Sequence, residues 1–244
     1  MIGLLCATPE EIAALRRRLG LHADPVRYGP TAVWTGEHRG QGVAVALAGV
    51  GKVNAAAAAT LLLGMLQAQT LIFSGVAGGL NPDLPVGAVV LGQALAIHDY
   101  GIVAEQQFTP TASGGLPIGA PRLAALNPVS EAVRSRLSAL AGRVADRVSG
   151  PVRLGGVVTA DYFLNCAVTR DELHATFGAD AIDMESGAVN QVAEAWGAPL
   201  YVIRTLSDLA GSESHITYYE MAQMAADNSA ACVLELLDML RVQA

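Results

Sequence analysis

The sequence has 244 residues and a mass of 25.2 kDa, and 52% of its residues are hydrophobic while only 15% are charged. A disordered chain has the opposite balance, so this composition excludes disorder and predicts a folded protein with a sizeable core. The net charge of −7 disfavours a nucleic-acid partner, because proteins that bind a phosphate backbone concentrate basic side chains.

Hydropathy and cysteine content indicate where in the cell the protein is expected. The mean hydropathy of +0.39 is high, but the longest largely apolar stretch, residues 55–66, is shorter than the ~20 residues that span a bilayer. The first residues lack a basic leader, so no secretory signal is predicted. The three cysteines form no CxxC pair, and an odd number argues against a disulfide framework. We therefore expect no membrane partner and a cytoplasmic location.

Apolar runs and turn residues divide the first half of the chain. Residues 2–7 predict a buried strand. Thr8 and Glu11 then open a helix that ends near Gly20, because threonine and a glutamate three residues later form a capping box. Further elements are expected as strands at 31–37, 42–48 and 71–74 and a helix at 53–67. The glycine-rich residues 75–79 predict a flexible run after the last of these strands.

The second half alternates strands and helices. Residues 98–127 lack clear periodicity, and loops of this length inside compact domains are often functional. Strands are expected at 88–97, 152–159, 181–182 and 200–205, and helices at 128–140, 168–177, 185–196 and 217–240. This alternation implies a largely parallel sheet covered on both faces. Since no linker or repeat interrupts it, we expect one α/β domain over residues 1–244.

Several common site motifs are incomplete in this sequence. Residues 49–53 lack the first glycine and the final Ser or Thr of a phosphate-binding P-loop, and residues 75–79 lack the dinucleotide spacing. HExxH, a Cys–His cluster and GxSxG are absent from the sequence. The sequence therefore predicts no metal, no cofactor and no serine nucleophile.

Candidate functional side chains lie where strands end, the edge at which sheets of this kind bind ligands. Glu11 is either a capping-box glutamate or a general base, and the roles are compatible because a helix N-terminus holds a carboxylate firmly. Asp183-Met184-Glu185 supplies either first-turn acids of a helix or functional carboxylates. Ser207-Asp208 is either a helix cap or part of a catalytic site. Phe163 is either a core residue or a stacking platform.

Five segments in one order carry a family resemblance, namely residues 7–11 (ATPEE), 49–55 (GVGKVNA), 74–80 (SGVAGGL), 183–185 (DME) and 204–208 (RTLSD). The chain resembles the purine nucleoside phosphorylase/uridine phosphorylase superfamily, and within it the bacterial 5′-methylthioadenosine/S-adenosylhomocysteine nucleosidases. The resemblance implies a three-layer α/β/α sandwich with a central mixed, largely parallel sheet. It also implies hydrolysis of the N-glycosidic bond of methylthioadenosine, S-adenosylhomocysteine and 5′-deoxyadenosine, which releases adenine and a 5-substituted ribose.

By this resemblance, carboxyl groups divide the acid and base work of glycoside hydrolysis. Asp208 is the acid at adenine N7, oriented by Ser207, and its environment should raise its pKa so that it holds a proton at neutral pH. Glu11 is the base that positions and deprotonates the water. Glu185 holds the ribose 2′- and 3′-hydroxyls, and Met184 packs under the sugar.

The resemblance also implies how the base is bound. Phe163 stacks on adenine, and backbone groups at Leu164 read the edge of the base. Ala77 and Gly78 let the main chain approach the nucleoside closely.

The 5′ substituent is expected to occupy an apolar slot. Thr8, Val50 and Tyr218 match family positions near this slot. Ile102, in the 98–127 loop, matches a position that the neighbouring subunit contributes, so a homodimer is implied. The bulky Tyr162 stands where a small residue is usual.

The alternative functions differ in the nucleophile that attacks the ribose or in the group attached to its 5′ carbon. A phosphorylase would need arginines for the phosphate dianion, which a carboxylate at Glu11 would repel, so hydrolysis is favoured. A nucleoside of the futalosine or aminofutalosine type stays open as the substrate, because Asp208 does not specify the 5′ group. A catalytically silent nucleoside-binding protein would lack Glu11, Glu185 or Asp208, and all three are present.

Overall fold

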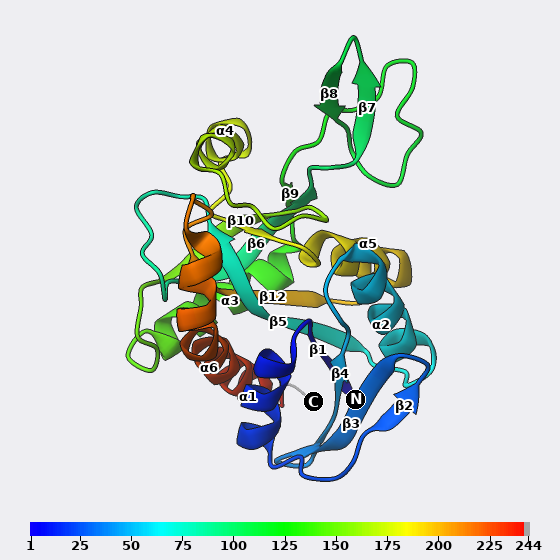
Figure 1. The fold of residues 1–244 in the computed structure, drawn as a ribbon. Helices are drawn as coiled ribbons and strands as arrows, with labels where there is room; N and C mark the ends of the chain where they lie inside the picture. Colours follow the sequence, from blue (N-terminus) through cyan, green and yellow to red (C-terminus); the bar gives the residue numbers. More distant parts are fainter. Residues whose placement is uncertain (242–244) are drawn as a thin grey trace.

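The computed structural model describes residues 1–241, and Figure 1 shows their arrangement. The strands are β1 (Ile2–Cys6), β2 (Val26–Tyr28), β3 (Thr31–His38), β4 (Gln41–Leu47), β5 (Thr70–Gly79), β6 (Val89–Ile97), β7 (Gly101–Ala104), β8 (Gln107–Pro110), β9 (Asn127–Pro128), β10 (Val152–Thr159), β11 (Ala181–Asp183) and β12 (Leu200–Asp208). The helices are α1 (Pro9–Leu19), α2 (Lys52–Gly64), α3 (Glu131–Val144), α4 (Ala167–Phe177), α5 (Ser186–Trp196) and α6 (Ser214–Arg241).

The main sheet has the strand order β11-β10-β6-β12-β5-β1-β4-β3-β2, with β9 beside β6. Parallel pairing joins β4, β1, β5 and β12 at its centre, while β6 runs antiparallel to β12 and β3 antiparallel to β4. The expected α/β fold with a mixed, largely parallel central sheet is therefore confirmed. The sheet also curls on itself, because β11 pairs with β10 on one side and with β5 on the other. This curl brings the carboxyl ends of β5, β10, β11 and β12 together.

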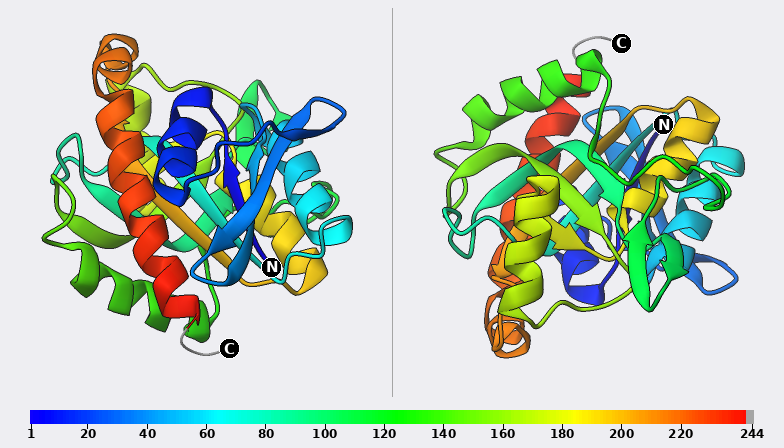
Figure 2. Two further views of the ribbon diagram at one scale, coloured as in Figure 1. Left: turned by 90° about the horizontal axis from the view of Figure 1, so that it is seen from below. Right: turned by 90° about the horizontal axis from the view of Figure 1, so that it is seen from above.

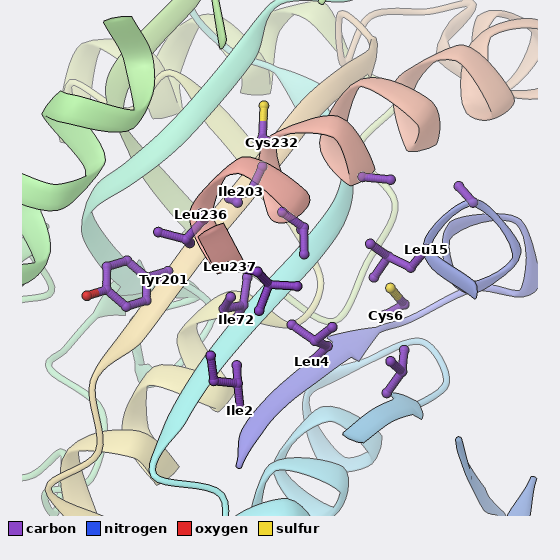
Figure 3. Packing of buried hydrophobic residues seen from close by; sticks show 14 of the residues in the cluster. Ile2, Leu4, Cys6, Leu15, Ile72, Tyr201, Ile203, Cys232, Leu236 and Leu237 are labelled. Atoms are coloured by element: carbon purple, nitrogen blue, oxygen red, sulfur yellow. The ribbon is translucent and has the colours of Figure 1, made fainter. Parts of the chain in front are cut away.

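Helices cover both faces of the sheet, as the alternation of elements predicts. α1, α3 and α6 pack on one face, and α2 and α5 pack on the other (Figure 2). On the first face, Leu4, Ile72 and Ile203 from three neighbouring strands meet Leu236 of α6, and all four are fully buried (Figure 3). Burying a side chain of this size contributes about 2 kcal/mol, so these apolar layers are the main support of the sheet.

Local signals set most helix boundaries. Thr8 caps α1, Glu11 completes the capping box and Gly20 ends the helix in the left-handed conformation with φ 67°, as predicted. The helix expected from residue 128 begins later, at Glu131, because Ser130 is its N-cap and Pro128 pairs with β6. Among the helices of residues 1–241, none combines the length and apolar content needed to cross a bilayer.

The prediction of a flexible run at residues 75–79 is wrong. β5 continues through them to Gly79, paired with β12 and β11, and β12 likewise continues beyond residue 205 to Asp208. The glycines provide space rather than flexibility. A Cβ on Gly75 would lie 2.3 Å from Glu11 Oε1 and 2.5 Å from Arg204 Nη1, so two functional groups close in on the bare backbone.

The long stretch 98–127 contains a small element of its own. β7 and β8 pair as an antiparallel hairpin, which projects away from the body of the molecule in Figure 1. Val103 and Phe108 on this hairpin are exposed.

We expect Gly75→Ala to lower the free energy of unfolding by about 1–3 kcal/mol, because the added methyl group collides with a buried carboxylate and a buried guanidinium. Gly142→Ala in α3 is the matched control, since nothing lies within 4 Å of its added Cβ and alanine favours a helix. Urea unfolding followed by circular dichroism compares the two variants. A Gly75→Ala variant as stable as the wild type would contradict this packing.

Candidate active site

A cavity of about 420 Å³ opens where the carboxyl ends of β1, β5, β11 and β12 meet. Its wall includes the predicted site residues Thr8, Glu11, Val50, Ala77, Gly78, Phe163, Leu164, Met184, Glu185, Ser207, Asp208 and Tyr218. Segments that are far apart in the sequence thus supply one site, at the edge of the sheet where ligands of α/β folds bind. Ile102 is absent from this wall.

Glu11 is a capping residue and also part of the cavity wall. Its Oε2 accepts hydrogen bonds from the backbone N–H groups of Ala7 at 2.7 Å and Thr8 at 3.0 Å, and its Oε1 accepts one from Val76 at 2.9 Å. Burial raises the pKa of Glu11, and this outweighs the lowering by Arg204 and by the three N–H groups. The carboxyl group is therefore fixed in direction and more basic than an exposed glutamate.

Arg204 lies behind the cavity wall with its side chain completely buried. The guanidinium stacks over the Phe73 ring at 3.9 Å, and its Nε and Nη2 each lie 2.8 Å from Asp183 Oδ2. Burial by itself lowers the pKa of Arg204, but Asp183, Glu185 and Glu11 together raise it above its usual value. The site therefore contains a permanent buried cation that faces three carboxyl groups.

Glu185 connects this cation to the cavity. Its Oε2 lies 3.6 Å from Arg204 Nη2, and its Oε1 accepts a hydrogen bond from the backbone N–H of Gly51 at 2.9 Å. Burial raises the pKa of Glu185 to about 7, although Arg204 and the Gly51 N–H oppose the shift. The carboxyl group therefore changes charge near neutral pH.

Asp183, the first residue of the same motif, is occupied by structural partners. It accepts hydrogen bonds from the Thr159 hydroxyl at 2.6 Å, from the Ser186 hydroxyl and from Arg204. Asp183 borders the cavity, but with these bonds its carboxylate serves mainly to hold Arg204.

Asp208 is a further carboxyl group in the cavity wall. Its Oδ1 accepts a hydrogen bond from the backbone N–H of Ala210 at 2.8 Å, and its Oδ2 accepts one from the Ser207 hydroxyl at 2.9 Å. Burial raises the pKa of Asp208, and these two donors, together with the Ser214 side chain, only partly oppose it. A Cβ on Gly78 would lie 3.2 Å from Asp208 Oδ1, so the backbone of β5 runs close to this carboxyl group.

Aromatic rings form the apolar part of the wall. Phe163 is 47% exposed, and its ring meets Tyr218 edge to face at 6.1 Å, with Tyr219 a further 5.6 Å beyond Tyr218. Burial, assisted by Glu11 and Glu10, raises the pKa of Tyr218 to about 12, so its hydroxyl is neutral. An exposed phenylalanine beside a cavity offers a face on which a flat ring can stack.

Some wall residues had no role in the sequence-based assignment. They are Ala7, Val76, Tyr162, Ile182, His215 and Tyr219, while Asp183 was a candidate carboxylate without a specific role. Arg204 was also missed, although a lone arginine inside the apolar strand expected at 200–205 is a detectable signal, since a buried charge needs partners. Within residues 1–241, no three His, Cys, Asp or Glu side chains come together in a way that could hold a metal ion.

Comparison with known proteins identifies the family. Residues 1–238 match the phosphorylase superfamily. The 5′-methylthioadenosine/S-adenosylhomocysteine nucleosidase of Mycobacterium tuberculosis (strain CDC 1551 / Oshkosh) is 35% identical, over 98% of this chain and 97% of the relative.

Two solved structures from Helicobacter pylori are similar over 98% of this chain. Its futalosine hydrolase has a TM-score of 0.84 at 25% identity, with 97% of that chain covered. An aspartate-to-asparagine variant of its nucleosidase, with 5′-methylthioadenosine in the active site, has a TM-score of 0.83 at 26% identity, with 98% covered. The chain described here therefore belongs to the phosphorylase superfamily and, within it, to the family of 5′-methylthioadenosine/S-adenosylhomocysteine nucleosidases, which are N-glycosidases.

Proposed function

We propose that the protein hydrolyses the N-glycosidic bond of 5′-methylthioadenosine and S-adenosylhomocysteine, and also that of 5′-deoxyadenosine. The products are adenine and a 5-substituted ribose. The observation that carries the proposal is the convergence of three buried carboxyl groups, those of Glu11, Glu185 and Asp208, on one cavity with an aromatic wall. Hydrolysis of a glycosidic bond needs an acid at the leaving group and a base at the water, and this set can supply both.

Asp208 is the proposed acid at adenine N7. Its raised pKa favours the protonated form that an acid needs at neutral pH. The Ser207 hydroxyl and the Ala210 N–H fix the direction of the carboxyl group, and both stabilise the carboxylate that forms when the proton leaves. Adenine then departs as a neutral base, stacked on Phe163, with the backbone at Leu164 along its edge.

Glu11 is the proposed base for the attacking water. Three N–H groups hold its carboxylate in one direction, and its raised pKa makes it a better proton acceptor. Glu185 accepts hydrogen bonds from the ribose 2′- and 3′-hydroxyls above Met184. As the bond to adenine breaks, both carboxylates favour the positive charge that develops on the ribose.

Two alternatives use the same fold. A phosphorylase is disfavoured, because no arginine or lysine is among the described residues that line the cavity, and a phosphate dianion would meet Glu11 and Glu185. The likeness to a futalosine hydrolase favours a second candidate, the hydrolysis of a nucleoside of the futalosine type. The two candidates differ in the group attached to the ribose or the purine, while the acid and base roles stay the same.

We also propose that the protein is a homodimer in which Ile102 of the 98–127 segment completes the neighbouring site. The apolar side chains of Val103 and Phe108 are exposed on this projecting segment. Val53 and Trp196, on α2 and α5, are exposed as well, at 80% and 53%. Large apolar side chains are enriched at interfaces between subunits, so these exposed residues are candidates for that contact.

The function is tested by adenine release from 5′-methylthioadenosine and S-adenosylhomocysteine, in phosphate-free buffer and again with phosphate. We expect release at the same rate in both buffers, because water is the nucleophile. Chromatography quantifies adenine, and an aminofutalosine-type nucleoside is run as a parallel substrate. Release that requires phosphate would contradict hydrolysis, and release from the parallel substrate alone would select the second candidate.

Asp208→Asn tests both the role of Asp208 as the acid and the cost in stability of burying its negative charge. Because the folded-state pKa of Asp208 is raised, the stability that its protonated form contributes is complete below pH ~4 and is lost as the pH rises through that raised value. Asparagine carries no charge, so the Tm of the variant should rise relative to the wild type as the pH increases above ~4. Its kcat should fall about 10²–10⁴-fold. Thermal unfolding and kinetics measure both effects, and a Tm difference that does not change with pH would contradict the raised pKa.

A further inference from the structure

Lys52, the only lysine of the chain, stands at the centre of a closed network beside the site. Its ammonium Nζ lies 2.5 Å from Asp99 Oδ1 and 3.6 Å from Asp161 Oδ2. Its backbone N–H donates to Asp161 Oδ1 at 2.8 Å, and the Asp161 backbone N–H donates to Asp99 Oδ2 at 2.8 Å. One residue therefore joins two carboxylates, and all four carboxylate oxygens are engaged.

Each segment of this network carries a part of the site. Gly51, directly before Lys52, donates its N–H to Glu185. Asp161 lies two residues before Phe163, which forms the aromatic wall. The network therefore connects the turn that donates to Glu185, the proposed ribose-binding residue, to the segment that carries Phe163, on which adenine is proposed to stack.

Lys52 is one of three residues that hold the turn around the Gly51 N–H. The Asn54 side-chain amide donates to the Val50 carbonyl at 2.8 Å, and the Ala55 N–H donates to the Gly51 carbonyl at 3.0 Å. Gly49 and Gly51 both adopt left-handed φ values, 90° and 98°, which glycine reaches easily but which it also leaves easily. Lys52 is the anchor that directly follows Gly51, and both its side chain and its own N–H tie it to other segments. If Lys52 were released, the turn could rotate and withdraw the N–H from Glu185.

Stability alone gives a weak reason for this arrangement. The Asp161 side chain is 46% exposed, so its ion pair with Lys52 adds little to folding. The Lys52–Asp99 pair is more buried, at 21% and 20% exposure, so the cost of desolvating both charges offsets much of their attraction. Ordering a long lysine side chain also costs entropy. The cavity wall does not include Lys52, so any effect on the reaction passes through other residues.

We propose that Lys52 is a positioning residue, which fastens the turn at Gly49–Lys52 to the Asp161 segment and so holds the Gly51 N–H on Glu185 and the Phe163 ring at the cavity. This inference rests on the proposed function, because it takes Glu185 and Phe163 as the groups that bind the nucleoside. It also specifies an effect of pH. A carboxyl group that loses a hydrogen-bond donor holds its proton more tightly, so Glu185 would ionise at higher pH without this anchoring.

The variants Lys52→Met and Lys52→Arg test the proposal. We expect Lys52→Met to raise KM for 5′-methylthioadenosine about tenfold or more, since a hydrogen bond to a charged group is worth that factor. The acid limb of its kcat/KM profile should move to higher pH. Lys52→Arg keeps the charge, so it should recover most of kcat/KM and return the acid limb toward the wild-type position.

Arg143→Met is the matched control. It removes an ion pair to Glu235, with an N–O distance of 3.0 Å, away from the cavity wall. Its KM and its acid limb should equal those of the wild type.

Amide hydrogen exchange provides a readout that needs no turnover. Lys52→Met should speed exchange in peptides that cover residues 49–52 and 161–163, and Arg143→Met should not. Unchanged exchange in Lys52→Met would overturn the proposal. Faster exchange with an unmoved acid limb would also overturn it, because Lys52 would then be only structural. A wild type that releases no adenine would instead contradict the proposed function, and the exchange comparison would still decide whether Lys52 holds the turn.

Discussion

The candidate site depends on one buried cation. Arg204 is completely enclosed between the Phe73 ring and the carboxylates of Asp183 and Glu185, with Glu11 close by. A lone guanidinium could not be buried at this depth, and carboxyl groups this close would repel one another without it. The buried guanidinium and the buried carboxylates therefore stabilise one another. The strand ends that carry these residues must meet, and the curled sheet brings them together.

The burial that makes this cluster costly also tunes its chemistry. The pKa values of Glu11, Glu185 and Asp208 are all raised by burial, but their partners differ. Glu11 and Glu185 lie near Arg204, which favours their charged forms, whereas the partners of Asp208 are neutral donors, namely the side chains of Ser207 and Ser214 and the Ala210 N–H. Different surroundings on one cavity wall thus fit one carboxyl group to give a proton and the others to carry negative charge.

The sequence predicted the helices and strands better than it predicted the surroundings of the site carboxyl groups. The capping box at Thr8 and Glu11 and the sheet covered on both faces followed from local patterns, and the structure confirms both. The glycine run from Gly75 was misread, because its use is to leave space for Glu11 and Arg204, which are distant in the sequence. Arg204 itself was overlooked, since its partners lie on other strands and only the folded sheet brings them close.

Catalytic roles were beyond the reach of local patterns for a similar reason. Position alone could not separate a capping glutamate from a catalytic base at Glu11, and the fold shows that the same carboxylate caps α1 and borders the cavity. The family resemblance named most of the residues that line this cavity, and one that does not line it, Ile102. The network around Lys52 comes from contacts between segments that the sequence does not relate to one another, whereas Ser207 and Ala210, which hold Asp208, are its neighbours in the sequence.

The most direct test of the account is the turnover of Glu11→Gln on 5′-methylthioadenosine, compared with Glu10→Gln, a change at the exposed neighbouring glutamate of the same helix turn. If Glu11 directs and deprotonates the water, Glu11→Gln should lose about 10²–10⁴-fold in kcat while binding of the nucleoside by calorimetry stays within about tenfold, and Glu10→Gln should match the wild type. Near-normal turnover of Glu11→Gln would contradict the base role and with it the assignment of the site as a hydrolase.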